Sequence, residues 1–204
     1  MPADCTFRKR YHINDDSSVD TPFRLKQTHT IGNVKELLKG SRYAEDFKNG
    51  TFAHYFLSPY SYHRFHTPVT GIVRESYPVE GLTYLEVNLK DGRFDAPDNA
   101  ENGYEFRQAR GVITIDTTLQ PEGNKGIVAV VPVGMCQVSS VHMTLKPSPD
   151  TVQKGTEFGK FLFGGSDIIV LFQKGMAPKI DECNVYRYYG RSMSICPPPP
   201  PNEP

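Results

Sequence analysis

Short apolar runs and alternating stretches, separated by segments rich in glycine and proline, run through most of the chain. Residues 126–133 are almost continuously apolar, and Ile168 to Phe172 form a second such run directly after Gly164-Gly165-Ser166. Apolar runs of this length, bounded by turn signals, predict buried strands. Residues 83–89 and 140–145 alternate apolar with polar side chains, which predicts half-buried strands. The remaining strand candidates are residues 51–57 and 111–116.

One short segment near the N-terminus has the pattern of a capped helix. Asn33 stands at the N-cap position, Glu36 follows three residues later, and Gly40 lies just past the end of residues 34–38. This arrangement predicts a short helix, with a further helical turn over residues 42–47. Together with the strands, it predicts an α+β fold that is mainly antiparallel β, with a short N-terminal helix.

The connections carry their own signals. Residues 58–69, with Pro59 and Pro68 near their ends, predict an ordered loop, and residues 91–103, rich in Asp, Asn and Gly, predict a second loop. Beyond residue 175 the pattern weakens, and residues 197–201 are all proline, which predicts a disordered polyproline II tail. We therefore divide the chain into one domain over residues 1–175 and a C-terminal extension over residues 176–204.

Composition removes several classes of function. The 204 residues hold 23 Lys+Arg and 23 Asp+Glu, and a zero net charge argues against general electrostatic binding to nucleic acid. No apolar run approaches the ~20 residues of a membrane span, and no signal peptide is recognisable. The cysteines form no CxxC pair, which favours reduced thiols over a disulfide framework or a zinc site; they are Cys5, Cys136, Cys183 and Cys196. These features predict an intracellular, cytoplasmic protein that is soluble or peripheral to a membrane.

Two groups of residues are candidates for chemistry. Ser166 follows two glycines, which allows either a tight turn into the strand, capped by Ser166, or a nucleophile with an unhindered carbonyl before it. His63 and His66 lie three residues apart, and His54 is nearby. One of these histidines is either buried and bonded to a carbonyl or acts as a general base. A metal site built from all three is disfavoured, because no cysteine pair accompanies them and Glu75 has no diagnostic spacing.

Several motifs occur together in a fixed order. They are Pro2-Ala3-Asp4, the stretch YFLSPYSYHRFHTPVTG from Tyr55 to Gly71, the segment from Val131 to Val141, and Phe163-Gly164-Gly165-Ser166. This ordered set resembles the phosphatidylserine decarboxylases, which are pyruvoyl enzymes that process themselves. The Tyr-His-Arg-Phe-His stretch is the specific part of the match, since a Gly-Ser pair alone is weak.

The resemblance implies a triad of Asp4, His66 and Ser166 that acts on the chain's own backbone. Asp4 would orient His66, His66 would take the proton of Ser166, and the hydroxyl would attack the carbonyl of Gly165. Cleavage between residues 165 and 166 would convert Ser166 into a pyruvoyl group, the only cofactor implied. That group would react with the substrate amine and accept electrons from the departing carboxylate, with His63 as the acid that protonates the product.

The chain also departs from the family pattern. Cys5 replaces a glycine, and Gly164 and Asp167 flank the cleavage site where better-known members have other residues. These changes resemble a fungal branch of decarboxylase-like proteins, some of which act on free aromatic amino acids. We expect phosphatidylserine as the substrate and phosphatidylethanolamine as the product. The alternatives are a free amino acid such as tryptophan, or an inactive truncated relative that serves as a binding module. A homo-oligomer is left open.

Overall fold

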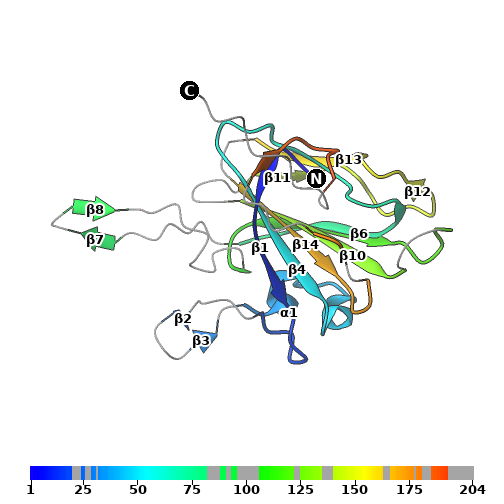
Figure 1. Ribbon diagram of the computed structural model, residues 1–204, viewed down its shortest axis with the longest axis horizontal. Coiled ribbons are helices and arrows are strands. Elements are labelled where there is room, and N and C mark those ends of the chain that lie inside the picture. Colours follow the sequence, from blue (N-terminus) through cyan, green and yellow to red (C-terminus); the bar gives the residue numbers. More distant parts are fainter. Residues whose placement is uncertain are drawn as a thin grey trace, which may run out of the picture.

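A computed structural model of the chain describes residues 1–19, 24–25, 29–30, 32–81, 88–90, 93–95, 106–121, 125–134, 140–162, 166–176, 178–180 and 185–192. Its centre is an antiparallel eight-stranded sheet (Figure 1). The strand order is β12 (Thr151–Val152), β6 (Gly71–Val79), β9 (Arg110–Asp116), β10 (Ile127–Gly134), β14 (Ser166–Phe172), β4 (Thr51–Leu57), β1 (Cys5–His12) and β15 (Tyr186–Arg187). The fold class predicted from the sequence is confirmed.

Each face of the sheet has its own cover (Figure 1). One face packs against a three-stranded sheet of β11 (Val141–Met143), β13 (Glu157–Phe161) and β5 (Arg64–His66). The other face packs against the helix α1 (Val34–Leu37) and the 3₁₀ turn η1 (Ala44–Phe47). Two-stranded ribbons, β2 (Arg24–Leu25) with β3 (His29–Thr30) and β7 (Asn88–Lys90) with β8 (Arg93–Asp95), complete the described elements.

The central strand β14 is apolar on both faces because both faces are covered. Ile168, Val170 and Phe172 belong to the cluster beneath the three-stranded sheet, while Ile169 and Leu171 belong to the cluster beneath α1. Successive side chains of a strand point to opposite faces, so a continuous apolar run is the pattern expected here. We call these two sides of β14 the Ser166 face and the Asp167 face, after the first residue on each.

The local predictions near the N-terminus are largely confirmed. Asn33 caps α1, since its side-chain oxygen accepts a hydrogen bond from the backbone N–H of Lys35 at 2.8 Å. Gly40, just beyond the helix, has φ +92°, a conformation that glycine adopts without strain. The predicted helical turn over residues 42–47 is η1.

Two loop predictions need correction, and two other predictions concern segments outside the described residues. Residues 58–69 are not a loop throughout, because Arg64–His66 pairs with β13 as the strand β5. Likewise, Arg93–Asp95 within the predicted loop 91–103 is the strand β8. Most of the predicted strand 83–89 and the polyproline run 197–201 lie outside the described residues. The division at residue 175 stays a prediction.

Candidate active site

Ser166 begins β14 and lies in the middle of the large sheet. It pairs with Gly134 of β10 on one side and with Leu57 of β4 on the other. The residue is 0% exposed, and its Oγ has no hydrogen-bond partner among the described residues. A buried hydroxyl without a partner is uncommon and costs free energy, so it calls for an explanation. Gly165, the predicted other half of the cleavage site, lies outside the described residues.

His66 ends β5, in the layer that covers the Ser166 face. Its Nδ1 lies 2.9 Å from the carbonyl oxygen of Gly155, and its Nε2 lies 3.3 Å from the hydroxyl of Tyr62. A carbonyl oxygen only accepts hydrogen bonds, so Nδ1 carries the proton and, in the neutral ring, Nε2 keeps its lone pair. The imidazole is thus held in the tautomer that suits a base acting through Nε2.

Asp4 lies close to His66 but does not bond to it. One oxygen of Asp4 accepts a hydrogen bond from the backbone N–H of Tyr189 at 2.8 Å, and the other lies 3.5 Å from the hydroxyl of Tyr186. The ring of Tyr189 in turn stacks on His66 with centroids 4.4 Å apart. The backbone N–H of His66 donates to the carbonyl of Pro2 at 2.7 Å. Asp4 and His66 therefore belong to one cluster whose link is Tyr189, and Gly155 holds the Nδ1 proton.

His63 lies just before β5, with its ring edge-on to Phe161 at a centroid distance of 6.3 Å. Its carbonyl accepts a hydrogen bond from the backbone N–H of the same Phe161 at 2.9 Å. Partial burial disfavours the imidazolium and lowers the pKa of His63 below its ordinary value of 6.5. The ring therefore lies at the end of β13, the strand that leads toward Ser166 along the chain.

The Asp167 face begins with a different polar arrangement that sequence reasoning missed. Asp167 is 0% exposed, and its Oδ1 lies 3.0 Å from Nε2 of His54, which is 2% exposed. The two side chains are in close contact, although the N–H is not aligned as a hydrogen bond. The available signal was a histidine and an aspartate at interior positions of two strands that are otherwise apolar.

The three histidines considered as metal ligands lie in different surroundings. His54 faces Asp167 in the large sheet, while His66 is in the three-stranded layer. Across the described ranges, no group of three or more His, Cys, Asp or Glu side chains gathers in a way that could hold a metal ion.

Arg187 was also missed, and it is the least expected side chain of this region. It is in β15, opposite Cys5 of β1, and only 8% exposed. Its Nη1 donates to the carbonyl of Ser192 at 2.8 Å, whereas Nε and Nη2 have no partner among the described residues. The sequence showed no periodic pattern here that would place a charged side chain in the interior.

Comparison with known proteins decides the family. The family model for phosphatidylserine decarboxylase matches residues 1–189 of the chain. The chain belongs to the phosphatidylserine decarboxylase family. The resemblance inferred from the ordered motifs is therefore confirmed.

Individual phosphatidylserine decarboxylases support the assignment. The chain is 34% identical over 158 residues to phosphatidylserine decarboxylase proenzyme 2 of Oryza sativa subsp. japonica, a match that covers 78% of this chain and 23% of the relative. It is 33% identical over 141 residues to the proenzyme of Chlamydia trachomatis, covering 69% and 42% respectively. It is 40% identical over 116 residues to proenzyme 2 of Komagataella phaffii, covering 57% and 10%. The chain thus spans less than half the length of each of these relatives.

Helices in the described part of the chain are short. None of them is long and apolar enough to cross a bilayer.

Proposed function

We propose that this chain is a self-processing, pyruvoyl-dependent decarboxylase that converts phosphatidylserine into phosphatidylethanolamine. The observation that carries the proposal is the buried Ser166 Oγ, which has no partner among the described residues and lies on the face covered by the layer of His66. A hydroxyl free of competing hydrogen bonds is suited to attack, and the matched relatives are named as phosphatidylserine decarboxylase proenzymes.

In the proposed processing step, Nε2 of His66 takes the proton of Ser166 as Oγ attacks the carbonyl carbon of Gly165. The C–N bond breaks, the nitrogen of Ser166 takes a proton, and an ester replaces the peptide bond. Loss of the α-proton of residue 166 then expels the Gly165 carboxylate. Water replaces the nitrogen of the remaining dehydroalanine, and ammonia leaves. Residues 1–165 and 166–204 become separate chains.

The Oγ of Ser166 is fully buried and has no partner among the described residues, which fits a residue that is consumed in making the cofactor. The pyruvoyl group, once formed at residue 166, supplies a carbonyl that acts as an electron sink for decarboxylation. The chain's own residues do the rest in this proposal. The apolar cluster of the Ser166 face excludes water, and His63 delivers a proton to the product carbon.

The test is the intact mass of the purified protein under denaturing conditions. We expect two chains with a break between residues 165 and 166, and a single uncut chain for Ser166→Ala. Ser76→Ala is the matched control, because the Ser76 Oγ is also buried and lacks a partner within the described ranges; it should be cleaved normally. An uncut parent chain would contradict self-processing.

The activity assay then separates the substrates. Vesicles containing phosphatidylserine and solutions of free tryptophan are supplied in parallel, and carbon dioxide release is measured. We expect release only from phosphatidylserine and only with the cleaved protein. Release from tryptophan alone would overturn the proposed substrate and leave the proposed processing intact.

A further inference from the structure

Arg187 is a charged side chain placed where a charge is costly. The residue is 8% exposed, and within the described part of the chain its guanidinium makes one hydrogen bond, from Nη1 to the carbonyl of Ser192. It forms no ion pair with any side chain in the part of the chain that the structure describes. Buried charges are normally paired, so an unpaired guanidinium points to a partner from outside the fold.

The two atoms without a partner among the described residues, Nε and Nη2, lie on the same edge of the guanidinium. Nε and Nη2 of an arginine donate toward the same side of the guanidinium plane and form a fork that matches the two oxygens of a carboxylate or phosphate. The single bond to Ser192 is made through Nη1 and leaves this fork intact. The side chain is therefore held through Nη1, and its buried Nε–Nη2 edge has no partner among the described residues.

The pairing of the strands puts Arg187 in the same row of the sheet as Ser166. Ser166 pairs with Leu57, and Cys5 pairs with Arg187. Because Thr6 lies opposite Phe56, Cys5 lies opposite Leu57. Paired residues of a sheet share a face, so Arg187 points to the Ser166 face, three strand spacings or about 14 Å away between Cα atoms.

The charge of Arg187 acts on two groups of the Ser166 face. Burial raises the pKa of the Cys5 thiol to about 12 and also raises the pKa of the Tyr55 hydroxyl, and the positive charge of Arg187 opposes both rises. Tyr55 lies on β4 two residues before Leu57, on the same face. The nearby Asp4 is already engaged by Tyr186 and Tyr189, so it does not neutralise the guanidinium by contact.

The geometry points to the Nε–Nη2 edge of Arg187 as the binding site for the phosphodiester of the substrate headgroup. This assignment deepens the proposed function and rests on it. In phosphatidylserine the phosphate lies only a few bonds from the amine, so a phosphate site on the same face as residue 166 suits this substrate.

The alternative oxyanion is the carboxylate of the same headgroup, and the reaction disfavours it. That carboxylate loses its charge as carbon dioxide departs, so an ion pair to it would stabilise the ground state more than the transition state. The phosphate keeps its charge throughout. An arginine that holds it contributes uniform binding, which lowers KM and leaves kcat unchanged.

Binding is tested in the uncleaved Ser166→Ala chain, so that no cofactor and no turnover are needed. Calorimetric titration uses glycerophosphoserine as the soluble headgroup, with inorganic phosphate and free serine as the separate arms. We expect glycerophosphoserine to bind, phosphate to compete with it, and serine to have no effect. Arg187→Met should weaken binding about tenfold to a hundredfold, and Arg187→Lys by less, because a point charge lacks the fork.

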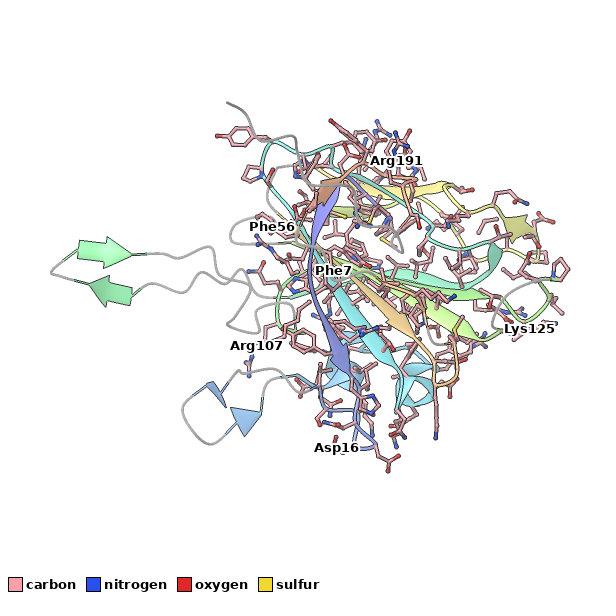
Figure 2. All side chains as sticks on the ribbon, viewed as in Figure 1. Phe7, Asp16, Phe56, Arg107, Lys125 and Arg191 are labelled. Atoms are coloured by element: carbon pink, nitrogen blue, oxygen red, sulfur yellow. The ribbon has the colours of Figure 1, made fainter. Side chains whose placement is uncertain are left out.

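Arg191→Met is the matched control, because Arg191 is an exposed arginine at the same end of the molecule (Figure 2) and should leave binding unchanged. Equal binding by the parent chain and Arg187→Met would overturn the assignment, as would serine binding that depends on Arg187 while phosphate fails to compete. If Arg187→Met does not fold, Arg187→Lys decides, and undiminished binding there overturns the proposal.

Cleavage is scored separately by intact mass in chains that retain Ser166. If cleavage fails but binding still depends on Arg187, the proposed function is contradicted and the anion site is supported. In a cleaved, active protein, Arg187→Met should raise KM for phosphatidylserine vesicles with kcat unchanged. A fall in kcat alone would contradict a phosphate anchor.

Discussion

The two faces of β14 begin with adjacent buried polar residues that are treated in opposite ways. Asp167 is in close contact with His54 beneath α1, whereas the Ser166 hydroxyl has no partner among the described residues beneath the three-stranded sheet. A carboxylate buried without a counter-charge would unfold the strand, so it is paired. A lone hydroxyl costs less, and the fold tolerates it where reactivity is needed. The difference separates a carboxylate that contacts a buried histidine from a hydroxyl that makes no hydrogen bond within the described residues.

The largest expected effect comes from breaking the pair on the Asp167 face. In the uncleaved Ser166→Ala background, Asp167→Ala should lower the free energy of unfolding by about 3–5 kcal/mol, because His54 then stays buried without its counter-charge. Urea unfolding measures the change. Replacing both residues with valine should recover much of the loss. A change below about 1 kcal/mol for Asp167→Ala would mean that the pair does not maintain the strand.

A second variant acts on the cover of the Ser166 face. A Cβ at Gly159 of β13 would lie 2.3 Å from a ring carbon of Phe65 and 2.4 Å from the carbonyl oxygen of His142. Gly159→Ala should therefore cost about 1–3 kcal/mol of stability through overpacking, again measured by urea unfolding. Gly175→Ala is the control for backbone strain, since Gly175 has φ +86° with nothing within 4 Å of the added Cβ, and it should cost only about 1 kcal/mol. Equal losses of stability for Gly159→Ala and Gly175→Ala would show that the three-stranded layer adapts to the added methyl group.

A smaller effect concerns pH. The pKa of His63 is lowered in the fold by burial, so the folded chain binds fewer protons at this site than the unfolded chain. The resulting stability is fully present above the ordinary pKa of 6.5 and is lost as the pH falls through the lowered pKa. Unfolding measured from pH 8 to 5 should show a weaker pH dependence for His63→Gln than for the parent. His142→Gln, at an exposed position of β11, is the control; identical profiles for His63→Gln and the parent would refute the burial effect.

The last effect is on chemical reactivity rather than on stability, and it tests how well the Ser166 face is sealed. Burial raises the pKa of Cys5 to about 12, and its thiol donates to the carbonyl of Ala3 at 3.2 Å. Only the thiolate reacts with alkylating reagents, so labelling of Cys5 by iodoacetamide at pH 8 should be at least about a hundredfold slower in the folded chain than in urea. Peptide mass spectrometry locates the label. Rapid labelling in the folded state would show that water reaches this face.

Much of the fold could be predicted because local patterns report burial and capping. The apolar runs of β10 and β14 and the Asn33 cap of α1 are properties of short windows, and each is confirmed. By contrast, β1 and β15 were missed. β1 carries Arg8, Lys9 and Arg10 and has an irregular pairing near Phe7, which hides the alternation that identifies a strand. β15 has only two residues, and its position depends on a partner at the other end of the chain.

The candidate site also has features that the sequence could predict and features that it could not. The order of motifs along the sequence was enough to predict Asp4, His63, His66 and Ser166 as functional candidates, and their roles stay predictions. Sequence reasoning assigned Asp4 to orient His66, whereas Gly155 accepts the Nδ1 bond and Tyr189 lies between the two side chains. A buried histidine bonded to a carbonyl was one of the two alternatives drawn from the sequence, but residue type does not reveal which histidine or which carbonyl is involved.

The sequence by itself determined the family and the predominance of antiparallel strands, and it supplied the candidate site residues, whose roles stay predictions. Only the tertiary structure decided which of these residues meet. The contact of Asp4 with Tyr189 joins residues 185 positions apart, and strand pairing rather than local sequence places Arg187 opposite Cys5. Hydrophobic periodicity encodes which side chains are buried, but packing and register select their partners.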